Sequence, residues 1–134
     1  DATEVKVKHH GTTYTLDKST TYGYKSTTGE VFRFVGNEAY TVLNPDEDLL
    51  LYLHTTPVSP LVNPTKKVEE HYYFSKDAAS APVDLTIDNL KKAFHENSKF
   101  LASIDKYFKK DEQLSSYDEK RKTYTLNRLL QSSR

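Results

Sequence analysis

The chain contains no cysteine, and this absence excludes disulfide bonds, thiolate metal sites and cysteine nucleophiles. It also lacks long apolar runs. The longest one, Leu49 to Leu53, is far shorter than the roughly 20 residues that a membrane-spanning helix needs, so no transmembrane segment is expected. Neither sign of charge is in excess, because 19 Lys and Arg residues balance 19 Asp and Glu residues. Without a net positive field to attract phosphates, nucleic acid is not an expected partner.

Methionine is absent as well, and the chain begins at Asp1. We therefore expect that the translational start has been removed, either with a secretory signal or by trimming at another boundary. The front half is rich in Thr and Tyr, residue types that fit the pleated surface of a sheet. Because sheets of this composition are frequent in exported proteins, we expect an extracytoplasmic location: periplasmic, surface-associated or secreted.

The hydrophobic period changes near Thr86. Before it, apolar and polar residues alternate, and after it apolar residues recur every three or four positions. At 134 residues the chain fits one domain, residues 1–134, with a β-rich part over 1–76. The pattern predicts an α+β fold: an antiparallel sheet of about six or seven strands in residues 3–76, followed by two or three short helices in residues 86–131 that pack on it.

Seven segments alternate well enough to be strands, with turn residues such as Gly36-Asn37 between them. The segment 48–55 is so dense in Leu that burial on both faces is expected, which makes it the central strand. The predicted strands are 3–8, 12–16, 21–25, 30–35, 38–43, 48–55 and 67–75.

The segment from Thr56 to Thr65 holds three prolines, which donate no ladder hydrogen bond, so we expect it to leave the sheet as an extended loop. Its apolar residues Val58, Leu61 and Val62 have two interpretations. They could form a contact surface on a preorganised segment, or they could be buried against the core of the domain. The sequence favours burial.

Thr86 has the chemistry of a helix N-cap, because its hydroxyl can accept a hydrogen bond from a first-turn amide. Apolar residues then recur at helical spacing until Glu96-Asn97-Ser98, which is suited to end one helix and cap the next. Ser116 to Glu119 has the form of a capping box before a last, Leu-rich helix. We therefore expect two short helices with a bend between them and a third after the capping box.

The back half resembles the tail of small exported proteins of unknown function from Bacteroidota-type bacteria. The resemblance covers roughly residues 70 to 131 and implies export and a sheet-plus-helices domain, but it brings no catalytic residues. The segments that carry it are His71-Tyr72-Tyr73-Phe74, Asp84-Leu85-Thr86, the run from Asn89 to Phe94, Tyr107-Phe108-Lys109-Lys110 and the closing Leu-rich helix.

The best candidate site lies on one strand, where Glu69, His71 and Tyr73 share a face at two-residue spacing. A carboxylate beside an imidazole fixes its tautomer, so the three could bind a ligand, hold a metal or act as an acid/base pair. The pattern favours the other interpretation, in which they form a polar outer face opposite Val68, Tyr72 and Phe74. We take them as ligand-binding candidates and assign no catalytic residue, metal ligand or cofactor.

Other polar clusters have structural explanations. His9 and His10 point to opposite faces of a strand end, whereas His54 ends a buried strand and His95 ends a helix, where the macrodipole favours a cation. Asp46-Glu47-Asp48 supplies carboxylates for Ca²⁺ but lacks the spaced ligands of an EF-hand loop, so a solvated turn is favoured. The lysines of the tail are interleaved with acids and predict a mixed, solvated face.

Two hypotheses follow. The first is an exported, non-enzymatic binding or interaction module for a protein, a glycan or a small ligand, and the absence of any known catalytic motif favours it. The second is a small hydrolase or metal-assisted enzyme that uses Glu69 and His71 with a carboxylate from elsewhere.

Overall fold

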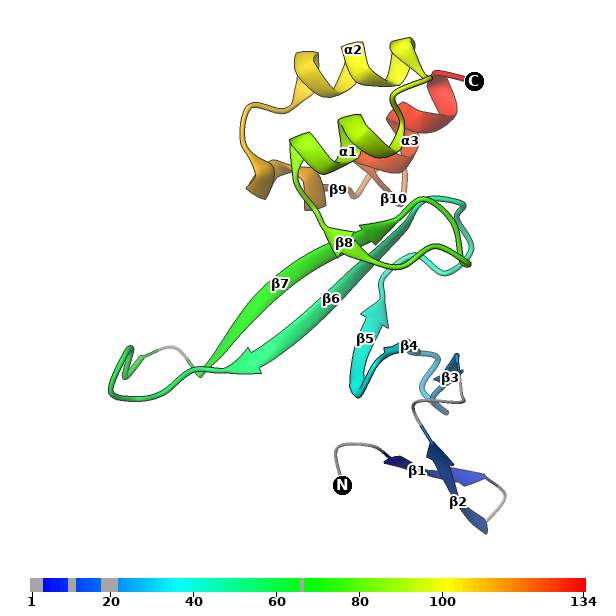
Figure 1. Ribbon diagram of the computed structural model, residues 1–134, viewed down its shortest axis with the longest axis vertical. Helices are drawn as coiled ribbons and strands as arrows, with labels where there is room; N and C mark the ends of the chain where they lie inside the picture. Colours follow the sequence, from blue (N-terminus) through cyan, green and yellow to red (C-terminus); the bar gives the residue numbers. More distant parts are fainter. Residues whose placement is uncertain (1–3, 10–11, 18–21, 66) are drawn as a thin grey trace. The chain divides into compact units, whose positions relative to one another are not determined.

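The computed structural model describes residues 4–9, 12–17, 22–65 and 67–134. These residues form an α+β fold in which strands come first and helices follow, as the change of period predicts (Figure 1). Six strands form an antiparallel sheet in the order β3-β4-β5-β6-β7-β8, and two further pairs, β1-β2 and β10-β9, form small sheets. The strands are β1 (Glu4–His9), β2 (Thr12–Asp17), β3 (Gly23–Lys25), β4 (Val31–Val35), β5 (Glu38–Val42), β6 (Leu50–Pro57), β7 (Val68–Ser75), β8 (Val83–Asp84), β9 (Tyr117–Asp118) and β10 (Thr123–Tyr124). The helices are α1 (Ile87–Ala93), α2 (Ser98–Tyr107), the 3-10 helix η1 (Asp111–Ser115) and α3 (Thr125–Ser132).

The chain divides into two compact units. Unit 1 comprises residues 1–45 and 52–71, and unit 2 comprises residues 46–51 and 72–134. One boundary, between residues 45 and 46, lies in the connection that follows β5, and the other two fall inside β6 and β7, so both strands contribute residues to each unit. The expectation of a single domain over residues 1–134 stays a prediction.

In unit 1 the register of the antiparallel strands sorts the side chains onto two faces. Phe32 and Phe34 share a face, as their spacing predicts, and Tyr24 of β3 stacks on Phe32 with 4.9 Å between ring centroids. Arg33 lies between them on β4 and therefore points to the opposite face. Gly23 pairs with Arg33, and a Cβ at this glycine would lie 2.1 Å from the Phe32 carbonyl oxygen. The close approach of β3 to β4 thus requires glycine at this position.

Unit 2 contains a helical core and the ends of the two long strands. The predicted caps are confirmed, because the Thr86 hydroxyl accepts from the Asn89 amide at 3.1 Å and the Asn97 side chain accepts from the Phe100 amide at 3.1 Å. The Leu-rich start of β6 is buried, and β6 is an interior strand of the sheet as predicted. The buried apolar residues of the unit are Leu49, Leu50, Leu51, Phe74, Leu85, Leu90, Phe94, Phe100, Ile104, Phe108, Leu114, Leu126, Leu129 and Leu130.

One helix start differs from its prediction. The segment Ser116 to Glu119 is not a capping box, because Tyr117 and Asp118 form β9 and pair with β10, and α3 begins at Thr125. The Ser116 hydroxyl instead donates to the Gln113 carbonyl and closes η1. None of the helices in the described part of the chain is both long and apolar enough to span a membrane.

The N-terminal prediction of a hairpin is confirmed over the described strands. β1 and β2 pair antiparallel from Glu4 opposite Asp17 to His9 opposite Thr12. The predicted turn at His10-Gly11 and the predicted strand starts at Thr3 and Thr21 lie outside the described residues.

Candidate functional site

The structure brings two of the three predicted site residues into contact. Glu69 and His71 occupy alternate positions of β7, and the Glu69 Oε2 atom lies 3.5 Å from His71 Nε2. Their side chains are 49% and 46% exposed, so solvent reaches both. Tyr73 follows on the same strand but belongs to unit 2, where it is half-buried.

A second histidine–carboxylate contact lies in unit 1, at residues whose spacing does not predict one. His54 Nε2 of β6 lies 3.0 Å from Glu38 Oε2 of β5. The register Val42 to Tyr52, continued along the two strands, places Tyr40 beside His54, and their ring centroids are 4.8 Å apart. The His54 side chain is only 15% exposed, so the tyrosine ring and the carboxylate hold it in place.

Thr56 links the two contacts. It shares a face of β6 with His54, and its hydroxyl lies 3.5 Å from His71 Nε2. We call the resulting row the histidine strip, which consists of Glu38, His54, Thr56, His71 and Glu69. Among the residues that the structure describes, no group of three or more His, Asp or Glu side chains is arranged to hold a metal ion. The strip therefore offers hydrogen-bond donors and acceptors to a ligand.

Arg33 is a buried charge of unit 1 that its sequence pattern does not single out. Its Nη1 donates to the Tyr52 hydroxyl at 2.8 Å, and its guanidinium lies 4.7 Å from the centroid of the Tyr22 ring. The residue is only 7% exposed. A charge this buried needs such partners, so Arg33 joins β4 to β6 and to Tyr22, the residue that precedes β3.

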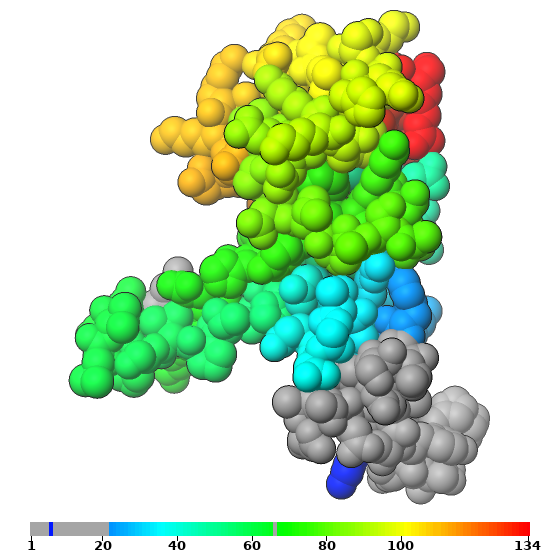
Figure 2. Space-filling model, in the orientation of Figure 1, coloured from blue at the N-terminus to red at the C-terminus, as the bar shows by residue number. Residues whose placement is uncertain are grey.

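The segment that joins β6 to β7 exposes two apolar side chains. Leu61 is 97% exposed and Val62 is 79% exposed, so the prediction that they are buried against the core is wrong. We call residues 58–65 the hairpin tip; it lies at the far end of the β6–β7 hairpin (Figure 1), and the space-filling view shows its atoms at the surface (Figure 2).

Hydrogen bonds fix the backbone of the hairpin tip. The Ser59 carbonyl accepts from the Val62 amide at 3.0 Å and from the Asn63 amide at 3.1 Å, and the Ser59 hydroxyl accepts from the Leu61 amide at 3.2 Å. The Asn63 side chain accepts from the Thr65 amide and hydroxyl. The apolar residues are thus presented by an ordered turn.

The chain matches no known protein family, curated protein or solved structure. Asp48 accepts from the Arg134 guanidinium at 3.0 Å and Glu47 lies 3.4 Å from the Gln131 amide, so these acids of the predicted solvated turn meet the end of the chain. His95 contacts the Lys92 carbonyl just past the end of α1, consistent with its predicted structural role.

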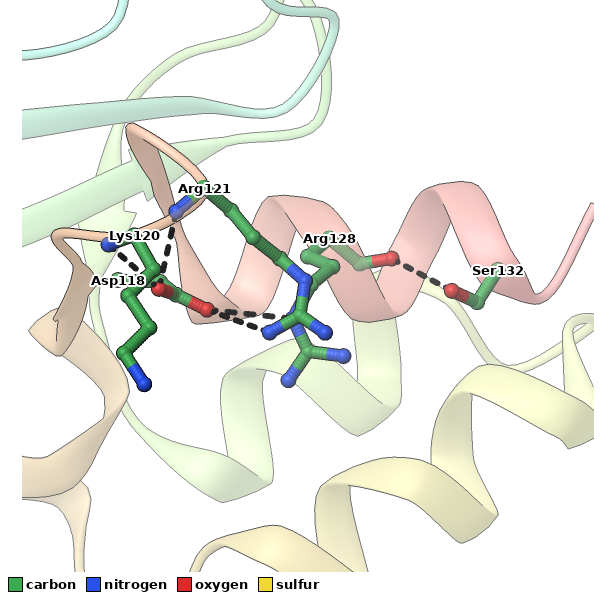
Figure 3. Close-up of polar contacts among 5 residues, drawn as sticks. All are labelled: Asp118, Lys120, Arg121, Arg128 and Ser132. Carbon is green, nitrogen blue, oxygen red and sulfur yellow. Dashed lines mark hydrogen bonds and ion pairs between the residues drawn. The ribbon is translucent and has the colours of Figure 1, made fainter.

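Asp118 organises a polar cluster in unit 2 (Figure 3). Its carboxylate accepts from the Lys120 amide at 3.0 Å, from the Arg121 amide at 3.1 Å and from the Arg121 guanidinium at 2.9 Å. These bonds, that of the Arg121 side chain foremost, hold the pKa of Asp118 below its usual value. Arg128 Nε lies 3.9 Å from the carboxylate and, among the described residues, has no hydrogen-bond partner. The cluster fixes the turn between β9 and β10.

Unit 2 also carries an open groove of about 420 Å³ between the end of α1 and the start of α2. Lys76, Lys99 and Glu96 line it together with Phe94, and the Lys76 ammonium lies 5.9 Å from the centroid of the Phe94 ring. Charges of both signs meet there. In unit 1, by contrast, the hairpin tip presents exposed apolar side chains and the histidine strip presents hydrogen-bonding groups.

Proposed function

We propose that this chain is an extracytoplasmic, non-enzymatic binding module whose hairpin tip docks into an apolar pocket of a partner protein. The observation that carries the proposal is the exposure of Leu61 and Val62 on an ordered turn, 97% and 79% respectively. The Thr- and Tyr-rich front and the resemblance of residues 70 to 131 to small exported proteins support the location.

The energetics of the tip favour binding. Complete burial of a Leu or Val side chain yields about 1.5–3 kcal/mol, so the pair supplies several kcal/mol when a partner covers it. Association is opposed by the ordering of loops and side chains at the interface. The Ser59 and Asn63 bonds, together with Pro60 and Pro64, already fix the backbone, so little ordering remains to be done on binding.

A protein pocket suits the tip better than a lipid surface does. Stable membrane attachment needs a larger apolar area or a second attracting group, such as a polybasic patch. Leu61 and Val62 are flanked by uncharged polar residues, and the lysines that follow in the sequence, Lys66 and Lys67, are fewer than the roughly four to eight basic residues of a lipid-binding cluster. Two apolar side chains on a rigid projection match a small pocket in a protein, where a few residues provide most of the binding energy.

The alternative is a hydrolase or metal-assisted enzyme that uses Glu69 and His71, and the 3.5 Å contact between them supports it. Among the described residues no set of metal ligands accompanies the pair, and the side chains of Glu69 and His71 are 49% and 46% exposed, so the pair is not enclosed as such chemistry requires. The binding function is therefore the one that the geometry supports better.

The proposal is tested by affinity capture from the extracytoplasmic fraction of the source cells. The bait proteins are the natural chain, the double variant Leu61→Ser/Val62→Ser, and the control Tyr107→Ser, which alters a 49% exposed aromatic residue of unit 2. We expect a partner that the natural chain and the control retain and that the double variant loses at least tenfold, because 1.4 kcal/mol already corresponds to tenfold in affinity. Equal retention by all three baits, or retention by phospholipid vesicles in place of a protein, would contradict the proposal.

A further inference from the structure

We infer that the partner also extends the sheet: the outer edge of β7 at Val68–His71 accepts an extended segment with basic side chains at alternate positions. This inference deepens the proposed function and rests on it for the identity of the partner as a protein. The inference is based on the lengths of two neighbouring strands. β7 has eight residues, whereas β8, its neighbour on that side, has two.

The paired part of the outer edge is short. β8 pairs with β7 at Tyr73 opposite Asp84 and Phe74 opposite Val83. The Tyr72 carbonyl accepts one further bond, from the Leu85 amide at 3.1 Å. Within the described chain, no strand other than β6 neighbours the stretch from Val68 to His71, and all four of its residues are exposed.

One hydrogen bond beside the hairpin tip shows which way the backbone groups of Val68–His71 point. The Lys67 carbonyl accepts from the Val58 amide at 3.0 Å, so Lys67 directs its backbone groups toward the β6 side. Backbone groups alternate in direction along a strand, so Glu69 and His71 also face β6, whereas Val68 and Glu70 face away from it. The amides and carbonyls of Val68 and Glu70 are thus a template for one more strand.

The two carboxylates of this edge determine which kind of strand can pair with it. Glu69 and Glu70 project from opposite faces of this edge. If a second copy of the chain paired here, these carboxylates would lie near their counterparts, and like charges on neighbouring strands are destabilising. Lys or Arg residues at alternate positions of a partner strand would lie beside them instead. The carboxylates therefore disfavour self-pairing and favour a basic segment.

The test is a titration of the ¹⁵N-labelled chain with a capped seven-residue peptide in which Lys alternates with Val. We expect the amide signals of Val68 and Glu70 to shift most, since they donate to the added strand. Two peptide controls accompany it: the same peptide with N-methyl groups on the residues that pair with β7, and a version with Glu in place of Lys. Both should bind at least tenfold more weakly.

The matched protein variants are Glu70→Pro and Glu70→Gln. Proline at position 70 removes an N–H that points away from β6, so it leaves the β6–β7 ladder intact and should weaken the Lys peptide at least tenfold. Glutamine keeps the N–H and removes the charge, so it should weaken binding severalfold and reduce its dependence on salt. The N-methylated peptide tests the same hydrogen bonds on the natural chain if the proline variant does not fold.

Absence of shifts at Val68 and Glu70, equal binding of the Lys and Glu peptides, or full binding of the N-methylated peptide would overturn the inference. Failure of this inference is distinguishable from failure of the proposed function. The variant Leu61→Ser/Val62→Ser should bind the Lys peptide as the natural chain does, because its edge is unchanged. A partner that still requires Leu61 and Val62 while the peptide fails would leave the tip proposal standing.

Discussion

At the scale of single residues, the Asp118 carboxylate contacts residues close to it in the sequence and also Arg128 of α3. Two backbone amides and one guanidinium donate to it, and Arg128 of α3 lies 3.9 Å away (Figure 3). The hydrogen bond from the Arg121 side chain favours the charged form most, followed by the two amide bonds, and the pKa of Asp118 is therefore lowered. A group whose pKa is lower in the folded than in the unfolded chain stabilises the fold at pH values above its unfolded pKa, about 3.9, and this stabilisation is lost as the pH falls through the folded pKa.

The variant Asp118→Asn should therefore lower the Tm at pH 7 and at pH 5 by the same amount, because the natural carboxylate is charged at both values. At pH 3, which lies below the unfolded pKa, the difference in Tm should be smaller, because the unfolded chain then binds a proton at Asp118 and the stabilisation is reduced. Thermal melts by circular dichroism at the three pH values measure this difference. Glu119→Gln is the control, because Glu119 is 81% exposed and its nearest cation, Lys122 Nζ, is 3.8 Å away. A difference of the same size at pH 3 as at pH 7 would show that the charge of Asp118 is not what stabilises the turn.

At the scale of elements, α3 is joined to the start of β6 by one buried side chain. Asn127 is 2% exposed, and its Nδ2 donates to the Leu49 carbonyl at 2.9 Å. The contact spans 78 residues of sequence within unit 2. It ties α3 to Leu49, the residue that immediately precedes β6.

Replacement of Asn127 by Ala should lower the free energy of unfolding by roughly 1–3 kcal/mol, because a buried hydrogen bond is lost and its partners are left in an apolar surrounding. Gln131→Ala is the matched control on the same helix: Gln131 is exposed, and its contact with Glu47 is 3.4 Å long. The control should change the free energy by less than about 0.5 kcal/mol. Urea unfolding curves of both variants measure the effect, and equal midpoints would contradict it.

Elements were predictable from the sequence where local pattern decides them. The alternation around Phe32 and the N-cap at Thr86 involve neighbours a few residues apart, and both predictions are confirmed. The start of α3 was not predictable in this way. Ser116 has the residue type of an N-cap, but its hydroxyl donates to Gln113 and its carbonyl accepts from the Thr125 amide, so the segment forms β9 and not a helix start.

The candidate sites also differ in whether local sequence pattern predicts them. The contact between Glu69 and His71 follows from two-residue spacing on one strand, so the sequence predicts it. The contact between Glu38 and His54 depends on the register of β5 against β6, which residue spacing alone does not give. Leu61 was expected to be buried because it is apolar, but residue type does not determine where a turn held by Ser59 directs its side chains.

At the scale of the whole molecule, the division of the chain into two units bears on whether both units unfold in one cooperative transition. Two of the unit boundaries fall inside β6 and β7, between residues 51 and 52 and between residues 71 and 72. Each strand is continuous through its boundary, so the loss of structure on one side removes the ordered start of the ladder on the other. Small single domains usually unfold in one transition.

We therefore expect that Asn127→Ala, a change in unit 2, lowers the midpoint of unfolding equally for both units. Amide signals of Phe34 and Val42 report on unit 1, and those of Leu90 and Ile104 report on unit 2, because all four residues are buried. Their loss with rising urea should follow one curve in the natural chain and one shifted curve in the variant. If the unit 2 signals moved to lower urea while the unit 1 signals kept their midpoint, the strands would not couple the two units. In that case the expectation of a single domain over residues 1–134 would be wrong.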